Sequence, residues 1–211
     1  MTLQEAQHTL KEKLAAIYDG REANTIAGWV MENITGWQKV DRVIHKQTDL
    51  PREKLQQLEK YTRELLAHKP VQYVLHEAWF AGLNFYVDES VLIPRPETEE
   101  LVEWVATEAQ GKIILDVGTG SGCIPIALKK KLPGSAIYAC DVSQKALQVA
   151  IKNAGQHNTP IHFLQLDFLN RSSWSVLPRV DILVSNLPYI PMIDKSTMKE
   201  NVLQHERHLA L

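Results

Sequence analysis

The predicted architecture follows from the stretch Lys112-Ile113-Ile114-Leu115-Asp116-Val117-Gly118-Thr119-Gly120-Ser121-Gly122-Cys123. An apolar run ends at Asp116, glycines occupy every second position from Gly118, and an amphipathic segment starts at Ile124. This pattern predicts a buried strand, a tight turn and the first turn of a helix. Glycines allow positive φ angles and let a ligand approach the main chain closely. The N–H groups at the start of the helix favour a negative or polar ligand group.

The chain beyond this turn alternates between strand and helix patterns. We predict strands over residues 113–117, 136–140, 161–165 and 180–184, and helices over residues 124–132 and 143–154. This alternation predicts an α/β fold with parallel βαβ units, in which ligands bind at the carboxyl ends of the strands. Polar residues lie at or just after the ends of all four strands: Asp116, Asp141, Asp167 and Asn186. Each can be a helix cap or a turn former, but as a set they indicate a binding site.

The first 70 residues predict a small helical bundle, because apolar residues recur at helical spacing in four segments. We expect the first helix to include Tyr18 and to end at Asp19-Gly20. The second is expected to close at Thr35-Gly36, and the fourth to run from Pro51 to just before Pro70. The third is expected to carry the apolar residues Trp37, Val40, Val43 and Ile44.

Residues 71–95 predict a linker with a short hairpin between Trp79 and Val87. Pro94 and Pro96 then make a stiff, extended lead that holds Arg95 rigidly. Three acidic residues fall in the first turn of the next helix, where they complement its dipole: Glu97, Glu99 and Glu100. The predicted domains are therefore a helical bundle over 1–70, a linker over 71–95 and an α/β domain over 96–211.

The composition, 45% hydrophobic and 23% charged, is typical of a globular protein. A net charge of −2 gives no overall electrostatic attraction to nucleic acid or to an anionic membrane. No apolar run reaches the ~20 residues of a membrane helix, and the N-terminus lacks the regions of a signal peptide. We therefore expect a cytoplasmic protein without a membrane or nucleic-acid partner. Cys123 and Cys140 are expected to be buried, reduced thiols, and the eight histidines show no metal-ligand spacing.

Two classes of ligand fit a glycine turn followed by an acid after the second strand: a nicotinamide or flavin dinucleotide, and S-adenosylmethionine. In both, Asp141 would accept hydrogen bonds from ribose hydroxyls. The glycines read Gly-x-Gly-x-Gly, whereas the dinucleotide fingerprint is Gly-x-Gly-x-x-Gly. Asp116 would oppose a pyrophosphate but would suit the ammonium group of a methionine moiety.

The segment after the fourth strand, Asn186-Leu187-Pro188-Tyr189, favours S-adenosylmethionine. It resembles the (Asn/Asp)-Pro-Pro-(Tyr/Phe) motif of methyltransferases that act on planar amide or aromatic-amine nitrogens. Such a nitrogen is a poor nucleophile because its lone pair is delocalised. The Asn186 side-chain oxygen and the Leu187 carbonyl can accept its two N–H protons, and Pro188 keeps Leu187 extended. Tyr189 can stack on the planar group and face the sulfonium, so catalysis would depend on orientation and electrostatics.

With these motifs, the chain resembles the peptide chain release factor glutamine methyltransferases, the HemK/PrmC family. The resemblance runs from about Lys69 to the last residue. It rests on four segments: Pro70-Val71-Gln72-Tyr73, Leu92-Ile93-Pro94-Arg95-Pro96-Glu97-Thr98-Glu99, Leu115-Asp116-Val117-Gly118-Thr119-Gly120-Ser121-Gly122 and Ser185-Asn186-Leu187-Pro188-Tyr189-Ile190. The Ile-Pro-Arg-Pro-Glu-Thr-Glu segment is the most specific. The helical N-terminal region matches the family in layout, though not by motif.

The resemblance implies a Rossmann-like parallel sheet and methylation, from S-adenosylmethionine, of the glutamine side-chain amide in the Gly-Gly-Gln motif of class I release factors. It implies that Asp141 binds the ribose, that Phe168 packs beside the adenine, and that Asn186 lies between cofactor and substrate. The implied substrate-amide clamp is Asn186, Leu187, Pro188 and Tyr189. The implied cofactor turn is Gly118, Thr119, Gly120, Ser121 and Gly122. The helical domain is expected to help bind the release factor.

The sequence departs from the family pattern in three places. Leu187 replaces the first proline of the clamp, where we expect the carbonyl hydrogen bond to persist in a looser loop. His205-Glu206-Arg207 stands where the family usually has Tyr-Glu-Pro. The sequence stops at Leu211, before the family's last strands, so we expect a sheet that is incomplete at the C-terminus with the fourth strand as an exposed edge.

Two alternative functions remain from the residues alone. One is an adenine-nitrogen methyltransferase acting on RNA or DNA, because Asn-Leu-Pro-Tyr also resembles the ribosomal RNA adenine methyltransferases. Phosphate binding would need clustered basic residues. Near Asn186 the sequence offers Lys195 and Lys199, which are too few for such a cluster. The other is a catalytically incomplete, cofactor-binding fragment. A nicotinamide oxidoreductase is disfavoured by Asp116 and by the 186–189 segment.

Overall fold

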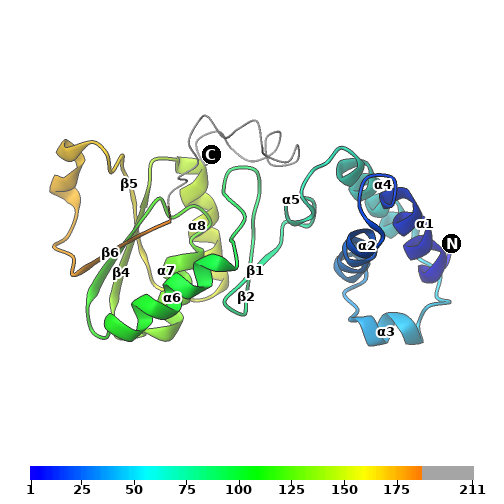
Figure 1. The fold of residues 1–211 in the computed structure, drawn as a ribbon, viewed down its shortest axis with the longest axis horizontal. Coiled ribbons are helices and arrows are strands. Elements are labelled where there is room, and N and C mark those ends of the chain that lie inside the picture. Colours follow the sequence, from blue (N-terminus) through cyan, green and yellow to red (C-terminus); the bar gives the residue numbers. More distant parts are fainter. Residues whose placement is uncertain (187–211) are drawn as a thin grey trace. The chain divides into compact units, whose positions relative to one another are not determined.

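The computed structural model describes residues 1–186 of the chain. The chain divides into two compact units, the first covering Met1–Leu75 and the second beginning at His76 (Figure 1). Within residues 1–186 there is no helix with the length and the apolar character needed to cross a bilayer.

The first unit is a helical bundle with its own core. It consists of α1 (Leu3–Leu14), α2 (Gly20–Thr35), α3 (Lys39–Ile44), α4 (Arg52–Leu66) and α5 (Val71–Leu75). Thr2 and Glu5 form a reciprocal capping box at the start of α1, and Gly36 ends α2 with a φ of 72°. The largest fully buried side chains of this unit are Tyr73, Leu3, Leu10, Leu14, Met31 and Leu65.

The first helix ends earlier than the apolar spacing predicted. α1 stops at Leu14, whereas the sequence pattern indicated a helix that includes Tyr18. The carboxylate of Asp19 accepts hydrogen bonds from the N–H groups of Arg21 and Glu22, at 2.8 and 2.9 Å. Asp19 therefore begins α2 as its N-cap instead of ending α1. Tyr18 nevertheless packs against the core of the bundle.

α3 is held by polar contacts, and its apolar residues face outward. Val40, Val43 and Ile44 are 70%, 62% and 68% exposed, so the expected apolar stripe exists on a helix but does not enter the core. The buried guanidinium of Arg42 donates from Nη1 to the Trp37 carbonyl at 2.7 Å and to Glu32 Oε2 at 3.2 Å. These bonds tie α3 to the end of α2, which apolar periodicity alone could not indicate.

The second unit begins with a hairpin and continues as a parallel α/β sheet. The hairpin consists of β1 (Ala78–Phe80) and β2 (Leu83–Phe85), which pair antiparallel. The sheet contains β3 (Ile113–Val117), β4 (Ala136–Asp141), β5 (His162–Gln165) and β6 (Ile182–Ser185). The helices are α6 (Glu97–Glu108), α7 (Cys123–Lys131), α8 (Gln144–Gln156) and the short 3-10 helix η1 (Arg171–Val176).

The sheet has the order β5-β4-β3-β6, and all of its pairings are parallel. The predicted parallel βαβ arrangement is thereby confirmed. Alternate residues of the central strands face different layers. Ile114, Ile137 and Val184 pack in the cluster that includes α6 and α7, whereas Leu115 and Cys140 pack with the chain that follows β5 (Figure 1).

The start of α6 is positioned by the proline-rich lead. Glu97, Glu99 and Glu100 occupy its first turn, as predicted. The Thr98 N–H donates to the Arg95 carbonyl at 3.0 Å. Glu99 Oε1 accepts from the Ala81 N–H at 2.9 Å, which fastens this turn to the hairpin.

Candidate active site

The glycine turn after β3 is bonded to the neighbouring strand. The N–H groups of Gly118 and Thr119 both donate to the Cys140 carbonyl, at 2.9 and 3.0 Å. Gly120 has a φ of 55°, and nothing lies within 4 Å of the position a Cβ would take there. Gly122 has a φ of 78°, and its Cβ would lie 3.0 Å from the Cβ of Ala150 on α8. The turn therefore packs tightly on α8 through Gly122 and leaves the backbone at Gly120 open to a ligand.

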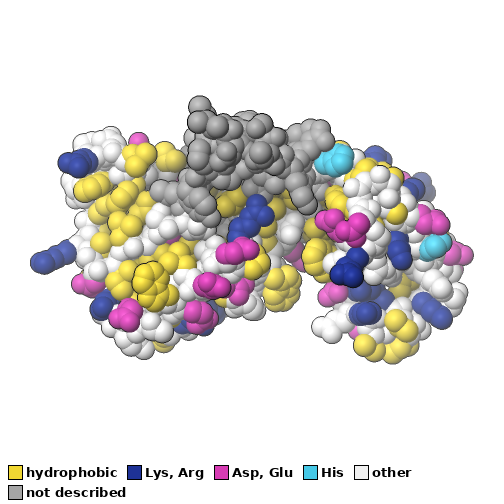
Figure 2. All heavy atoms as spheres, in the orientation of Figure 1, with side chains coloured by type: hydrophobic (Ala, Val, Ile, Leu, Met, Phe, Trp, Pro, Cys, Tyr) yellow, Lys and Arg dark blue, Asp and Glu magenta, His cyan; other side chains and the backbone are white. Residues whose placement is uncertain are grey.

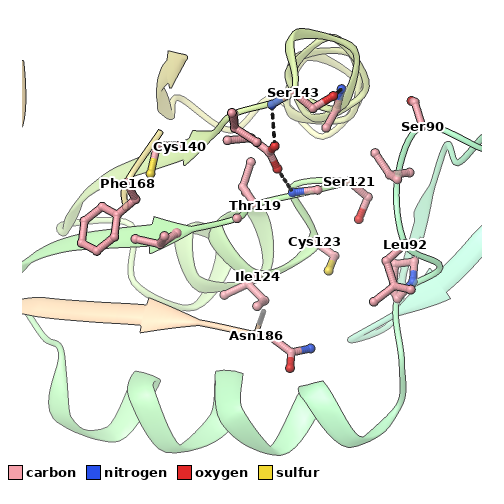
Figure 3. A pocket seen from close by; sticks show the side chains of 18 of the residues that line it. Ser90, Leu92, Thr119, Ser121, Cys123, Ile124, Cys140, Ser143, Phe168 and Asn186 are labelled. Atoms are coloured by element: carbon pink, nitrogen blue, oxygen red, sulfur yellow. Dashed lines mark hydrogen bonds between the residues drawn. The ribbon is translucent and has the colours of Figure 1, made fainter. Parts of the chain in front are cut away.

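A cavity of about 400 Å³ lies beside this turn, at the carboxyl ends of the strands. Three segments form most of its wall: residues 90–95, residues 117–121 and residues 166–169 (Figure 3). Its volume and mixed lining are those of a site for a small organic molecule. Of the predicted cofactor residues, seven line this cavity: Gly118, Thr119, Gly120, Ser121, Asp141, Phe168 and Asn186. Gly122 lies against α8 instead.

Asp141 is held at the end of β4 by two backbone donors. Its Oδ2 accepts from the Gly120 N–H at 3.0 Å, and its Oδ1 accepts from the Ser143 N–H at 2.8 Å (Figure 3). These bonds fix the plane of the carboxylate, and each oxygen retains a further lone pair for a ligand hydroxyl.

Asp116 is completely buried, and neither of its carboxyl oxygens has a hydrogen-bond partner among the described residues. The pKa of Asp116 is raised to about 7: burial raises it most, the neighbouring Thr119 hydroxyl lowers it in part, and the charge of Asp141 raises it by a smaller amount. Its side chain does not line the cavity, so direct contact with an ammonium group is not part of this geometry. A buried carboxyl without a partner is costly in an apolar core, and next to a ligand site it indicates a functional position.

The aromatic wall of the cavity is the ring of Phe168, which stacks on the ring of Trp174. Phe168 lines the cavity and lies 5.3 Å from Trp174, with 28° between the ring planes. Trp174 Nε1 donates to the Phe168 carbonyl at 2.8 Å. Trp174 was not anticipated from the sequence, because its contact with Phe168 depends on the turn of η1.

Asn186 follows β6 and lines the same cavity (Figure 3). Its Nδ2 donates to the Oγ1 of Thr98, in the first turn of α6, at 2.9 Å. The remaining clamp residues, Leu187, Pro188 and Tyr189, lie outside the described residues, as do Lys195, Lys199 and the segment His205-Glu206-Arg207. The sequence motif includes Thr98 but assigns it no role. Its hydroxyl, at the start of a predicted helix, was the signal that could have indicated a contact with the site.

Family models match both units of the chain. Residues 96–210 match the methyltransferase small domain, and residues 2–75 match the PrmC N-terminal domain. A release factor glutamine methyltransferase from Flavobacterium psychrophilum is 42% identical over 206 residues, which cover 95% of this chain and 72% of that protein. The chain belongs to the release factor glutamine methyltransferase family.

A second relative agrees with this assignment. The release factor glutamine methyltransferase of Streptococcus pneumoniae is 41% identical over 198 residues, covering 92% of this chain and 69% of that protein. Among solved structures, TrmN from Thermus thermophilus is 31% identical with a TM-score of 0.38, covering 43% of this chain and 27% of that one.

Membership of this methyltransferase family makes S-adenosylmethionine the cofactor. The cavity fits that molecule: it offers an open backbone at Gly120, an oriented carboxylate at Asp141 and an aromatic face at Phe168. Within residues 1–186, no three His, Cys, Asp or Glu side chains gather in a way that would hold a metal ion.

Proposed function

We propose that this protein methylates the side-chain amide nitrogen of the glutamine in the Gly-Gly-Gln motif of class I peptide chain release factors, in the cytoplasm. The observation that carries the proposal is the amide of Asn186, which lies at the cofactor cavity with its nitrogen already bonded to Thr98. An amide so oriented suits a substrate that is itself an amide. The names of the relatives point to the same reaction.

In this proposal the cavity residues hold the cofactor and set its direction. Gly118 to Ser121 approach it with their backbone, Asp141 accepts from the ribose hydroxyls, and Phe168 packs beside the adenine. Bound there, S-adenosylmethionine supplies an electrophilic methyl carbon on a sulfonium. The carboxylate of Asp141 also accepts from the Gly120 N–H. One side chain therefore both binds the ribose and holds the turn in shape.

The substrate side consists of Asn186 and the three residues after it. Asn186 Oδ1 and the Leu187 carbonyl accept the two N–H protons of the glutamine amide, while Pro188 and Tyr189 restrain and cover it. The amide nitrogen uses its lone pair to form the new N–C bond as the C–S bond breaks with its electrons going to sulfur. One amide proton leaves to water, so the products are the N-methylated glutamine and S-adenosylhomocysteine. Orientation and electrostatics drive this step.

The helical unit, which matches the PrmC N-terminal domain, is proposed to help bind the release factor. A nucleic-acid substrate has less support. On the face shown in Figure 2, Lys and Arg side chains are interspersed with Asp and Glu among the coloured residues, and they do not gather in one field.

The test is transfer of labelled methyl from S-adenosylmethionine to a purified class I release factor. The control is the same release factor with its Gly-Gly-Gln glutamine replaced by glutamate, and a further sample contains ribosomal RNA instead of protein. Label on the intact factor alone supports the proposal. Label on the RNA alone, or equal label on both forms of the factor, would overturn it.

A further inference from the structure

Thr98 is a buried hydroxyl directed at the candidate catalytic amide. It lies in the first turn of α6, is 7% exposed, and its Oγ1 accepts the hydrogen bond from Asn186 Nδ2 at 2.9 Å. The two residues are 88 positions apart in the chain. This contact joins the start of α6 to the end of β6 at the cavity wall.

The contact restrains the Asn186 side chain against the first turn of α6. An amide is planar, with donors on one arm and an acceptor on the other. When Nδ2 is bonded to Thr98, the acceptor Oδ1 is turned away from Thr98. Because a threonine hydroxyl can also donate, an Asn186 rotated by half a turn would still bond to Thr98, but it would present donors where the substrate amide also presents donors.

The backbone of Thr98, which carries this hydroxyl, is held in place. Its own N–H is bonded to the Arg95 carbonyl, and Pro94 and Pro96 restrict the backbone before it. The next residue, Glu99, is bonded to the hairpin at Ala81. The acceptor offered to Asn186 is therefore positioned before substrate arrives.

We propose that Thr98 is a positioning residue, which holds the Asn186 amide so that Oδ1 accepts from the substrate nitrogen. This inference rests on the proposed function and adds a residue to it. Loss of the Thr98 bond leaves Asn186 free to rotate, and one lost hydrogen bond of ordinary strength corresponds to about a tenfold lower kcat. The cofactor contacts of the glycine turn and Asp141 do not involve Thr98.

The test compares Thr98→Val, which keeps the shape but removes the hydroxyl, with Thr98→Ser, which keeps the hydroxyl. A matched control is Thr159→Val, because Thr159 is also 7% exposed and bonds only to the backbone, at the Ala154 carbonyl. For each protein we would measure kcat and KM with release factor, the dissociation constant of S-adenosylhomocysteine, and the melting temperature.

The expected result is a kcat about tenfold lower for Thr98→Val, restored to within about twofold by Thr98→Ser. The loss in kcat should exceed any change in the dissociation constant, because the glycine turn and Asp141 hold the cofactor without Thr98, and Thr159→Val should lower only the melting temperature. A Thr98→Val protein with unchanged kcat would overturn the inference. Equal losses in Thr98→Val and Thr98→Ser would also overturn it, because they would assign the effect to the methyl group.

A second readout separates this inference from the proposed function. The side-chain amide signals of Asn186, assigned by their loss in Asn186→Asp, are recorded by nuclear magnetic resonance in the cofactor-bound protein. They should change in Thr98→Val and return in Thr98→Ser, even if the release factor is not the substrate. Signals unchanged in Thr98→Val would overturn the inference, whereas absent methyl transfer by the wild-type protein would overturn only the proposed function.

Discussion

At the scale of single residues, the buried carboxyl of Asp116 makes the stability of the fold depend on pH, and this dependence can be tested. Its folded-state pKa of about 7 lies above the ordinary value of 3.8 for an aspartate. Between those values the folded chain retains a proton that the unfolded chain has lost, so this group makes stability fall as pH rises. Above about pH 7 both states are ionised at this position, and the effect levels off.

We therefore predict that Asp116→Asn becomes more stable relative to wild type as pH rises from 5 to 7. The gap in the free energy of unfolding should grow by roughly 2 to 3 kcal/mol over that range and stay constant up to pH 8. Urea unfolding of the two cofactor-free proteins at matched pH values measures it. A gap that does not change with pH would contradict the raised pKa of Asp116.

The second residue-scale prediction concerns Asp141. Asp141→Asn replaces an acceptor oxygen by an NH2 group facing the N–H of Gly120 or of Ser143. One of the bonds that hold the turn is then lost, and the contact with the ribose is weakened. We expect binding of S-adenosylhomocysteine to weaken by about tenfold or more, measured by titration calorimetry. Asp181→Asn is the control, since Asp181 also accepts one backbone N–H, from Ile113, but does not line the cavity. Equal affinities in the two variants would contradict this role.

At the scale of elements, α8 connects two walls of the cavity. The fully buried Asn153 donates to the carbonyls of Tyr86 and Ser121, both at 2.9 Å, and accepts from the Tyr86 N–H at 2.8 Å. Close by, Lys152 Nζ lies 3.1 Å from the centre of the Tyr86 ring. One face of α8 thus holds the glycine turn and the segment that leads into residues 90–95.

We predict that Asn153→Leu lowers the free energy of unfolding by about 3 kcal/mol, because one buried and two half-buried backbone groups lose their partners. Gln156→Ala removes a single exposed contact of the same helix, with the Asn84 carbonyl, and should cost less than about 0.5 kcal/mol. Urea unfolding followed by fluorescence compares the two variants. Similar costs would show that α8 does not depend on Asn153.

Elements were more predictable from sequence than the contacts between them. The strands of the sheet followed from short apolar runs, and the start of α6 followed from the prolines before it and the acidic residues of its first turn. The bonds from Thr98 to Asn186 and from Asn153 to Tyr86 span 88 and 67 positions, where local periodicity carries no information. α3 shows the same limit, because Arg42 holds it while its apolar residues stay exposed.

At the scale of the whole molecule, the two units have separate cores, and all the cavity residues belong to the second unit. A ligand stabilises the folded unit that binds it. The gain is about 2.7 kcal/mol when the ligand concentration is 100 times the dissociation constant. We predict that S-adenosylhomocysteine slows amide hydrogen exchange within residues 90–186 and leaves residues 1–75 unchanged. Mass spectrometry of proteolytic peptides with and without the ligand measures this. Equal slowing in both units would contradict it.

The bonds between the glycine turn and the Cys140 carbonyl have a consequence for turnover. These bonds lie within the protein, and in the proposed mode of binding the turn contacts the nucleoside part of the cofactor rather than the group being transferred. None of the contacts proposed for Gly118 to Ser121, Asp141 or Phe168 involves the methyl carbon. We therefore expect the spent molecule to be held by the same groups as the fresh one and to compete with it. The rate in a cell then depends on how fast the by-product is cleared as well as on how much donor is supplied.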